Sequence, residues 1–481
     1  MRKDIQKTKL EKLKKIRLAK MNPYPEKCER TLVNKQALKN FGKIKGEIIL
    51  VGRVKSMRPM GNATFVHIED GSGKIQLFLS KKNIGEEKYK LFVKSIEIGD
   101  FIQAWGELFL TKQNEKSLEV SKWKILAKNI RPIPTEYFGL KNKELLLRKR
   151  YLDLMINNQT REIFYKKNIF WQTIRKNLEE NNFLEVQTPI LELIPGGAEA
   201  EPFITHHNKL NQDFYLRISL ELSLKRLLVG GYEKVFEIGR VFRNEGMDRE
   251  HLQEYDTVEF YAAYWDLKKG MDFSEKIFKK IVFKIINGYV HKYENEKIDW
   301  SKKFLKVDYF TEFKKETNLD LNNDLTIEEL RAKADELNIK YESSYGKGRM
   351  IDTLYKKTVR PLLIQPCFLT GHPIEVSPLA KKDPHNPKKV LRFQIVAGGS
   401  ELCNAFSELN DPIDQKKRFL EQMKARKEGD KEAQMMDEDF VEALEYGMPP
   451  AFGFGMSERF FAFIMDKPIR ETVIFPQVKE K

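Results

Sequence analysis

Few cysteines and no long apolar run occur in this sequence. Its 481 residues include only three cysteines, Cys28, Cys367 and Cys403, which are far apart in the chain. A disulfide framework and a cysteine-based zinc site are therefore not supported. No stretch reaches the roughly 20 apolar residues that a membrane-spanning helix needs, and the N-terminus lacks the apolar core of a signal peptide. These absences predict a cytoplasmic protein without a membrane partner.

Basic residues outnumber acidic ones. Lys and Arg together number 86 against 70 Asp and Glu, which gives a formal net charge of +16. Such an excess favours an acidic partner, most often nucleic acid, although lysine-rich surfaces also occur in proteins that merely stay soluble. The length predicts two or more domains and a large buried core.

The first 22 residues have the pattern of a basic helix. Leu10, Leu13 and Ile16 recur at helical spacing between lysines, and the prolines at 23 and 25 end the pattern. Two interpretations remain open, a solvated tail and an arm that binds nucleic-acid phosphates.

Short strands with alternating hydrophobicity dominate residues 23–135. They are predicted at Ile48–Val54, Thr64–Ile68, Lys74–Leu79, Phe101–Gly106 and Leu118–Ile125. So many short strands in so few residues favour a five-stranded barrel of the OB type, although a small sandwich would give the same periodicity. Alternating prolines at 132 and 134 then predict a linker.

Long helices between strands characterise residues 136–481. Helices are predicted at Arg161–Asn181, Leu222–Val229 and Met271–Tyr293, and a charged helical insertion is expected near 300–350, around Leu325–Asn338. The expected fold class is α+β, with this part as the catalytic domain.

A first group of polar residues lies on two predicted strands, Val235–Val241 and Tyr255–Tyr261. Alternation places Tyr255, Thr257, Glu259 and Tyr261 on one face of the second strand. That face could hold a base and a cation. Arg243, after the first strand, could bind phosphate or carboxylate oxygens, although an isolated arginine is more often part of a surface ion pair.

Two more stretches carry candidate residues. In Gly398–Asn410, alternation places Asn404, Phe406 and Glu408 on one face, where Glu408 either faces solvent or binds a cation, because an unpaired buried acid is costly. In Pro449–Arg459, glycines precede Arg459 and an apolar helix at Phe460–Met465. Glycines allow a ligand to approach the backbone, and Arg459 could reach phosphate.

Together these stretches resemble the three signature motifs of the class II aminoacyl-tRNA synthetases in order and spacing. The first motif is similar to Phe183–Pro189, the second to Phe242–Glu245 with its strands, and the third ends in Arg459. Residues 195–198, 202–207 and 372–380 are similar to stretches typical of the lysyl-tRNA synthetase family, and the resemblance covers nearly the whole chain. It implies an OB-type anticodon-binding barrel and a catalytic domain built on an antiparallel sheet flanked by helices. It also implies ATP as co-substrate, Mg²⁺ as cofactor, tRNA(Lys) as partner, and a homodimer.

The same resemblance implies a lysine-binding set. The α-ammonium would lie near Gly197 and Glu221, and the carboxylate near Arg243 and Asn404. The distal ammonium would meet Glu259, Glu408 and Tyr261, and Phe406 would line the aliphatic stem.

For ATP, the resemblance implies that Arg243 and Arg459 are the catalytic residues that bind the phosphates. Glu245 and Tyr255 would hold adenine, His251 the triphosphate tail, and Glu401 magnesium. The implied metal set also includes Glu408 and Gln394. The implied anticodon-binding residues are Arg53, Phe65, Gln76 and Glu115, although for Phe65 the pattern slightly favours a place in the barrel core.

Several positions depart from the family pattern. Gln394 stands where a metal-binding glutamate is usual, and Glu199-Ala200-Glu201 has an acid where an arginine is usual. His251 is followed by Leu252 and Gln253 in place of the usual Asn-Pro. The third motif is one residue short, and alternation places Glu401 opposite Asn404, so that a bend must be assumed there.

Three alternatives share parts of this pattern. An aspartyl- or asparaginyl-type synthetase has the same architecture, but two convergent glutamates would repel an aspartate. A paralogue that transfers lysine to a protein would be expected to lack the barrel. A non-catalytic tRNA-binding paralogue would keep the fold without the chemistry.

Overall fold

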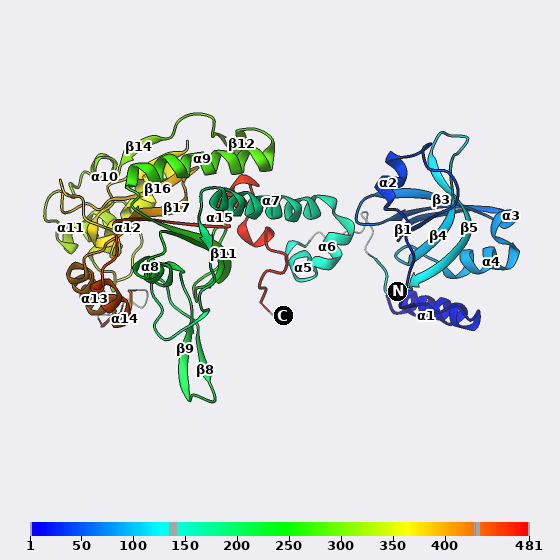
Figure 1. Cartoon of the computed structure of the whole chain (residues 1–481), viewed down its shortest axis with the longest axis horizontal. Coiled ribbons are helices and arrows are strands. Elements are labelled where there is room, and N and C mark those ends of the chain that lie inside the picture. The colour runs from blue at the N-terminus through cyan, green and yellow to red at the C-terminus, as the bar shows by residue number, and fades with distance from the viewer. Residues whose placement is uncertain (1, 134–141, 428, 430–432, 480–481) are drawn as a thin grey trace. The chain divides into compact units, whose positions relative to one another are not determined.

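Two compact units, Met1–Leu146 and Leu147–Lys481, make up the computed structural model (Figure 1). It describes residues 2–133, 142–427, 429 and 433–479. The domain boundary predicted at 135/136 lies outside the described residues. Within the described ranges, no helix is long and apolar enough to cross a membrane.

The N-terminal unit is a closed five-stranded barrel with strand order β1-β2-β3-β5-β4. The predicted OB-type barrel is therefore confirmed and the sandwich alternative is wrong. Alternate side chains such as Leu50, Val66 and Leu77 fill the interior. Its elements are β1 (Ile48–Met60), β2 (Ala63–Glu69), β3 (Lys74–Ser80), β4 (Phe101–Leu110) and β5 (Lys116–Ala127), with α2 (Asn34–Lys39), α3 (Lys81–Ile84) and α4 (Glu86–Ser95).

Phe65 lies on the outer surface of this barrel. Its neighbour Val66 is fully buried inside, and Phe65 packs against Phe78 with ring centroids 5.2 Å apart. Strand alternation requires this arrangement, because successive side chains point to opposite faces. The expectation that favoured the barrel core for Phe65 is wrong.

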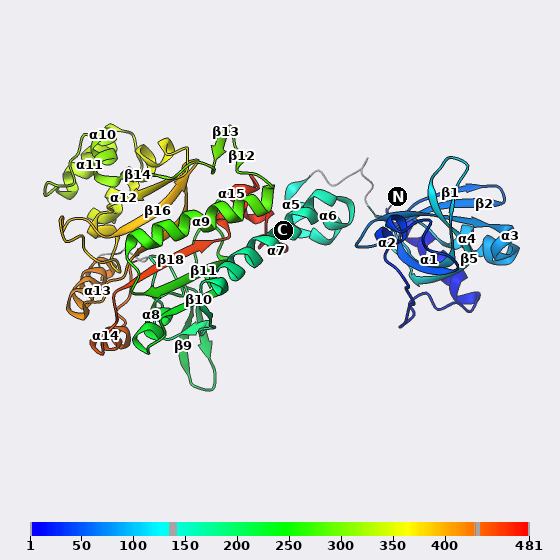
Figure 2. The same cartoon turned by 45° about the horizontal axis from the view of Figure 1, so that its top comes forward.

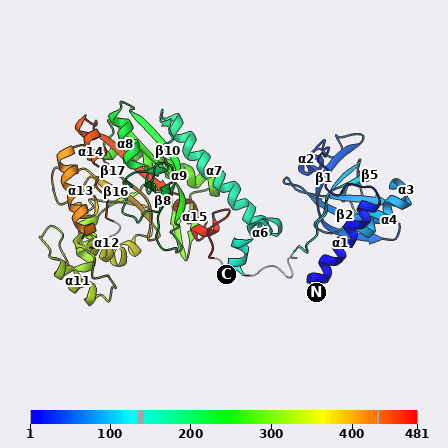
Figure 3. The ribbon, with the colours of Figure 1, turned by 90° about the horizontal axis from the view of Figure 1, so that it is seen from below.

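The basic N-terminal segment forms helix α1 (Arg2–Leu18), which lies beside α4 of the barrel unit (Figure 3). Leu13 and Ile16 are buried. Lys9 and Lys12 lie 3.3 and 2.7 Å from the Glu97 carboxylate. Although burial raises the pKa of Glu97, hydrogen bonds from Lys12 and Lys128 and the charge of nearby lysines lower it to about 2. The helix is thus anchored and is not a solvated tail.

An eight-stranded sheet forms the centre of the second unit, with strand order β14-β15-β16-β17-β18-β11-β10-β6. The sheet is antiparallel except at its two ends, where β14 pairs with β15 and β10 with β6 in parallel. This arrangement confirms the predicted α+β class. The strands are β6 (Leu184–Glu185), β10 (Lys234–Phe242), β11 (Glu254–Ala263), β14 (Leu305–Asp308), β15 (Cys367–Thr370), β16 (Arg392–Ala397), β17 (Ser400–Ser407) and β18 (Ala451–Ser457).

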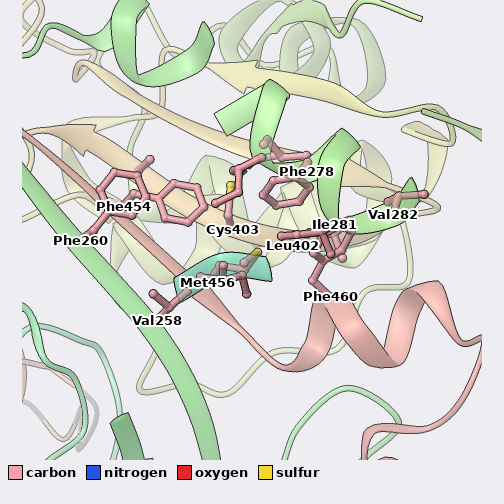
Figure 4. Packing of buried hydrophobic residues seen from close by; sticks show 14 of the residues in the cluster. Val258, Phe260, Phe278, Ile281, Val282, Leu402, Cys403, Phe454, Met456 and Phe460 are labelled. Atoms are coloured by element: carbon pink, nitrogen blue, oxygen red, sulfur yellow. Dashed lines mark hydrogen bonds between the residues drawn. The ribbon is translucent and has the colours of Figure 1, made fainter. Parts of the chain in front are cut away.

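Helices α7 (Asn158–Glu180) and α9 (Leu267–Ile286) lie side by side along this sheet (Figure 2). Beneath them is an aromatic core in which Phe278 stacks on Phe460 with centroids 4.2 Å apart (Figure 4). The helix predicted to continue to Tyr293 ends at Ile286, because Asn287 adopts a left-handed conformation with φ 55°. Residues Val290–Tyr293 instead form strand β12, which pairs with β13 (Glu296–Asp299).

Other elements surround the sheet. Helix α8 (Glu221–Val229) packs against β10, β11 and α14 (Glu438–Glu445). Between β14 and β15 the chain forms α10 (Tyr309–Thr317), α11 (Ile327–Glu336) and α12 (Lys347–Thr358), followed by the 3₁₀ turn η2 (Arg360–Leu362). The remaining elements are α5 (Lys143–Arg148), α6 (Arg150–Ile156), β7 (Leu191–Glu192), β8 (Ile204–His207), β9 (Gln212–Leu216), η3 (Ile374–Val376), α13 (Pro412–Lys427), α15 (Arg459–Ile464) and η4 (Ile469–Glu471).

Candidate active site

The central strands β11, β18 and β17 form the floor of a polar site. Tyr261 on β11 and Phe406 on β17 are both paired with Gly453 on the strand between them. A Cβ atom on Gly453 would lie 1.8 Å from Oε1 of Glu408 and 2.5 Å from Cε1 of Tyr261. Glycine at this position therefore lets an acid and a phenol converge over the sheet.

Glu259 is held on this floor by hydrogen bonds. Its carboxylate accepts from Ser219 Oγ at 2.9 Å, from the Leu220 amide at 3.1 Å and from the Tyr261 hydroxyl at 3.1 Å. Burial and the nearby charge of Glu221 raise the pKa of Glu259 to about 7, and these hydrogen bonds only partly offset the increase. A bound cation would stabilise the ionised form of this buried carboxylate.

Glu221 and Glu408 share a cation that belongs to the chain itself. The Lys225 ammonium lies 2.5 Å from Oε1 of Glu221 and forms an ion pair with Glu408, and its side chain is fully buried. Burial raises the pKa of Glu221, and Lys225 lowers it only in part. Sequence reasoning missed Lys225, although its position four residues after Glu221 on a helix could have indicated it.

Charge in this pocket is not balanced by the described side chains. Glu221, Glu259 and Glu408 are 6%, 8% and 1% exposed, and Lys225 is in contact with Glu221 and Glu408. Neither oxygen of Glu408 accepts a hydrogen bond of ordinary geometry from the described residues. Because unpaired buried charge is costly, the pocket is suited to a ligand that brings positive charge.

Gly197 closes the pocket beside Glu221. Its φ is +84°, and a Cβ atom there would lie 2.9 Å from both Cβ of Glu221 and Oγ of Ser219. The close approach therefore requires glycine, as do the backbone angles. The structure brings this residue together with Glu221, as the resemblance implies.

Asn404 lies on β17, and Arg243 directly follows β10. Asn404 Oδ1 accepts a hydrogen bond from Arg392 Nε at 2.7 Å, which fixes the amide orientation. Arg243 donates through Nε to the Ile218 carbonyl at 3.3 Å and lies 5.6 Å from the centre of the Tyr255 ring. Arg392, which orients Asn404, was not among the predicted residues.

Three of the predicted ATP residues, Arg243, Glu245 and Arg459, lie near Tyr255. Burial raises the pKa of its hydroxyl, and the charges of Arg243 and Arg459 lower it only in part. Arg459 donates to the backbone carbonyls of Glu401 and Glu250 at 3.2 and 3.3 Å. The loop between β10 and β11 is closed by a hydrogen bond from Gln253 Nε2 to the Glu245 carbonyl at 2.8 Å.

His251 lies on the exposed part of this loop. Its Nδ1 is 2.8 Å from the Asp248 carboxylate, and its side chain is 44% exposed. Hydrogen bonds from the Glu250 amide and from His251 lower the pKa of Asp248 against the effect of burial. An exposed, oriented imidazole of this kind remains compatible with the predicted contact to a phosphate tail.

A β-bulge supplies the bend that was assumed near Glu401. Ile395 pairs with Cys403 but the next residue, Val396, pairs with Glu401, so that Leu402 is an extra residue in β17. The bulge resets the alternation, and the Glu401 carboxylate faces Gln394, whose Nε2 donates to it at 3.2 Å. Oε1 of Gln394 lies 3.2 Å from Nε2 of His372.

The predicted metal set comes together only in part, because Glu401 and Gln394 are in contact but Glu408 is not near them. Glu408 lies seven residues beyond Glu401 along an extended strand, a separation on the order of 20 Å, and it is paired with Lys225. The expectation that Glu408 joins Glu401 as a ligand is therefore wrong. Among the described residues, no group of three or more His, Cys, Asp or Glu side chains could hold a metal ion.

On the barrel, three of the four predicted anticodon residues lie close together. Phe65 and His67 lie on β2, and His67 pairs with Gln76 on β3. His67 bridges Ser56 and Glu115 at 2.9 Å each, and Gln76 Nε2 donates to Ser117 Oγ at 2.8 Å. His67 was missed because its role depends on a contact across the sheet.

Arg53 has other neighbours. Its guanidinium lies 4.2 Å from the centre of the Phe101 ring and donates to the Gly99 carbonyl at 3.2 Å. Arg58, by contrast, pairs directly with Phe65 across β1 and β2 and is exposed. Arg58 was missed because the strand was predicted to end at Val54, whereas it continues to Met60.

Known proteins resemble both units of this chain. A family model described as "tRNA synthetases class II (D, K and N)" matches residues 142–479, and one described as "OB-fold nucleic acid binding domain" matches residues 48–126. A lysine–tRNA ligase from Carboxydothermus hydrogenoformans is 42% identical over 99% of this chain and 98% of its own length. One from Bacillus subtilis is 39% identical over 98% of this chain and 96% of its own length.

Proposed function

The chain belongs to the class II tRNA synthetases of the D, K and N group, and we infer from its pocket and its relatives that it is a lysine–tRNA ligase. The observation that carries this inference is the set of buried acids around one internal cation, Lys225. With ATP, the enzyme activates lysine and transfers it to tRNA.

Charge matching supports lysine as the amino acid. When ionised, Glu221, Glu259 and Glu408 bring three negative charges, and Lys225 brings one positive charge. Bound lysine brings two ammonium groups to the acids, and Arg243 balances its carboxylate. Aspartate or asparagine would leave Glu259, beside Tyr261, without a cation, which is costly in a buried site.

Lysine would lie along the sheet between the acids and the arginines. Its distal ammonium meets Glu259, Tyr261 and Glu408, and its stem packs on Phe406. The α-ammonium lies near Glu221 and Gly197. Its carboxylate is then directed towards Asn404 and Arg243, beside the place proposed for ATP.

Activation in such a site depends on positioning. The carboxylate oxygen attacks the α-phosphorus, and the bond to the leaving pyrophosphate breaks on the opposite side. Arg243 and Arg459 stabilise the charge that develops on the phosphate oxygens. Glu245 and Tyr255 hold adenine, and His251 contacts the triphosphate tail.

Magnesium fits the described donors only in part. Glu401 offers a carboxylate, but Gln394 uses its amide to join His372 and Glu401. Magnesium bound with ATP would neutralise phosphate charge, and its oxygen ligands would come mainly from the nucleotide. Glu401 is the residue that would contact it.

The barrel is proposed to bind the anticodon of tRNA(Lys). Phe65 offers an aromatic surface for an unpaired base, and Gln76, Glu115, His67 and Arg58 offer hydrogen bonds around it. The basic helix α1 adds positive charge on the same unit. In the second step the terminal ribose hydroxyl of tRNA attacks the aminoacyl carbonyl and releases AMP.

A homodimer is proposed from the first motif. The segment after Phe183 exposes large apolar side chains, and an exposed apolar patch of this kind favours a protein partner. A second copy of the chain would cover this patch. The exposed apolar residues are Leu184, Ile190, Leu191, Leu193 and Ile194.

We also propose that the enzyme works in the cytoplasm, where ATP and tRNA meet.

Amino-acid-dependent exchange of pyrophosphate into ATP tests the function directly. Lysine is expected to support exchange, and aspartate and asparagine are not. Exchange with aspartate instead would favour the aspartyl-type alternative. No exchange with any amino acid, together with tRNA binding, would favour the non-catalytic paralogue.

A further inference from the structure

Cations surround Glu401 in greater number than this one acid can neutralise. Nη1 of Arg360 lies 3.5 Å from Oε1 of Glu401, and Nη1 of Arg459 donates to the Glu401 carbonyl at 3.2 Å. Arg392 lies on β16, which pairs with β17, and its Nε donates to Asn404 on β17 at 2.7 Å. Lys356 lies four residues before Arg360, about one helical turn away, so that both side chains can face the same carboxylate.

Lys356 and Arg360 come from a part of the chain outside the three motifs. Lys356 lies on α12 and Arg360 on η2, in the segment between β14 and β15. Lys356 pairs with Asp352 at 2.8 Å and keeps 43% of its side chain exposed. The other acid near Arg459, Glu250, uses its carboxylate to accept from Ser400. The four cations Lys356, Arg360, Arg392 and Arg459 thus face three acids, Glu401, Asp352 and Glu250, which leaves one positive charge in excess.

Donors without partners accompany these cations. The Tyr309 and Tyr355 hydroxyls and Nε of Arg360 are buried and have no hydrogen-bond partner among the described residues. The two tyrosine side chains are each 1% exposed, and their ring centroids lie 4.7 Å apart. Buried donors are normally satisfied by protein or water, and a hydrated anion beside Arg360 would satisfy its Nε.

We propose that Lys356 and Arg360, together with Arg459, form a fixed-cation subsite for the leaving pyrophosphate of ATP. This inference rests on the proposed function. As the bond from the α-phosphorus to oxygen breaks, its electron pair goes to pyrophosphate, and positive side chains beside that group stabilise the charge. The subsite takes over part of the neutralisation that carboxylate-held magnesium would supply, which agrees with an amide at Gln394.

Binding of inorganic pyrophosphate without metal is the direct test. The full chain is titrated with pyrophosphate in a calorimeter in the presence of EDTA. Lys356→Ala and Arg360→Ala are each expected to weaken binding about tenfold, because each removes one phosphate-binding cation. Lys357→Ala is the matched control, since Lys357 is an exposed neighbour on the same helix, and it should bind as the wild type does.

Conservative variants keep this test decisive if one alanine variant fails to fold. Arg360→Lys retains the charge and should lose less affinity than Arg360→Ala, and thermal unfolding identifies variants that are not folded. Equal metal-free binding by the wild type and by the folded variants would overturn the subsite.

Magnesium titration of lysine-dependent exchange tests the proposed replacement of metal charge. Arg360→Ala is expected to need several-fold more magnesium for half-maximal exchange than the wild type, and Lys357→Ala is not. Superimposable curves would overturn the claim that these cations replace metal charge. Absence of exchange in the wild type at every magnesium concentration would refute the proposed function. The calorimetric titration without metal would still show whether Lys356 and Arg360 bind pyrophosphate.

Discussion

Lysine binding is expected to release a proton from Glu259. In the free protein, burial and Glu221 raise the pKa of Glu259 to about 7, so that close to half of the molecules carry the proton at neutral pH. An ammonium group within hydrogen-bond reach stabilises the ionised carboxylate and lowers this pKa by about 1–3 units. Lysine therefore binds to the ionised form and drives the proton off.

The size of the effect follows from the pKa. If binding requires the ionised carboxylate, the affinity for lysine falls about tenfold from pH 8 to pH 6, because about nine in ten carboxyls are protonated at pH 6. Calorimetry at pH 7 in buffers with different ionisation enthalpies should show about half a proton released per lysine bound. Glu259→Gln should bind lysine more weakly by roughly 2–4 kcal/mol at pH 8, with no such pH dependence.

Stability provides the control for this variant. The folded-state pKa of Glu259, about 7, lies above its ordinary value of 4.5, so that its contribution to stability is complete below pH 4.5 and is lost as the pH rises through 7. The change corresponds to about 3 kcal/mol from a shift of about 2.5 units. Glu259→Gln should therefore lose less unfolding free energy than the wild type between pH 5 and pH 8.

One result would refute this reasoning about Glu259. If the wild type binds lysine equally well at pH 6 and pH 8 and releases no proton, then Glu259 is already ionised in the free protein or does not meet the ammonium. Glu233→Gln is the matched control, because Glu233 is an exposed glutamate just before β10 and should leave lysine binding unchanged.

Three further variants test other parts of the protein. Lys225→Met should lower the unfolding free energy by about 3–5 kcal/mol at pH 8, because Glu221 and Glu408 lose their shared cation, and added lysine should restore part of it; an unchanged denaturation midpoint would contradict this. Gln394→Glu should lower the magnesium concentration for half-maximal exchange, and superimposable titrations would show that this position has no part in metal binding. Phe65→Ala should weaken charging of tRNA(Lys) by about 1–3 kcal/mol in kcat/KM for tRNA while exchange is unchanged, and equal charging would remove Phe65 from the anticodon site.

Local periodicity was sufficient to predict the strands that carry the pocket. Glu259 and Tyr261 share a face because β11 is regular, and their alternation could be read directly from the sequence. The face of Glu401 could not be read in this way. Its orientation depends on the bulge at Leu402, and an extra residue in one strand leaves no periodic signal.

Contacts across elements were also beyond the sequence pattern. Lys225 forms a helical pair with Glu221, which spacing could indicate, but its contact with Glu408 joins α8 to the end of β17. The cations around Glu401 were missed because Lys356 and Arg360 lie beyond the helical insertion predicted near 300–350 and belong to none of the three motif stretches. Their part in the site depends on how the segment that carries them packs against β16 and β17.

The two ends of β17 carry opposite electrostatic environments, and this polarity can orient the substrates. Beyond one end, Glu408 lies with Glu221 and Lys225 in a pocket that has an excess of buried acid. At the other end, Glu401 lies among Arg360, Arg459 and Lys356 in an excess of positive charge. Both ammonium groups of lysine lie on one side of its reacting carboxylate. In ATP, the anionic β- and γ-phosphates lie on one side of the reacting α-phosphate. A reversed placement of either substrate would bring like charges together, whereas the productive placement brings the lysine carboxylate and the α-phosphate together between the two ends.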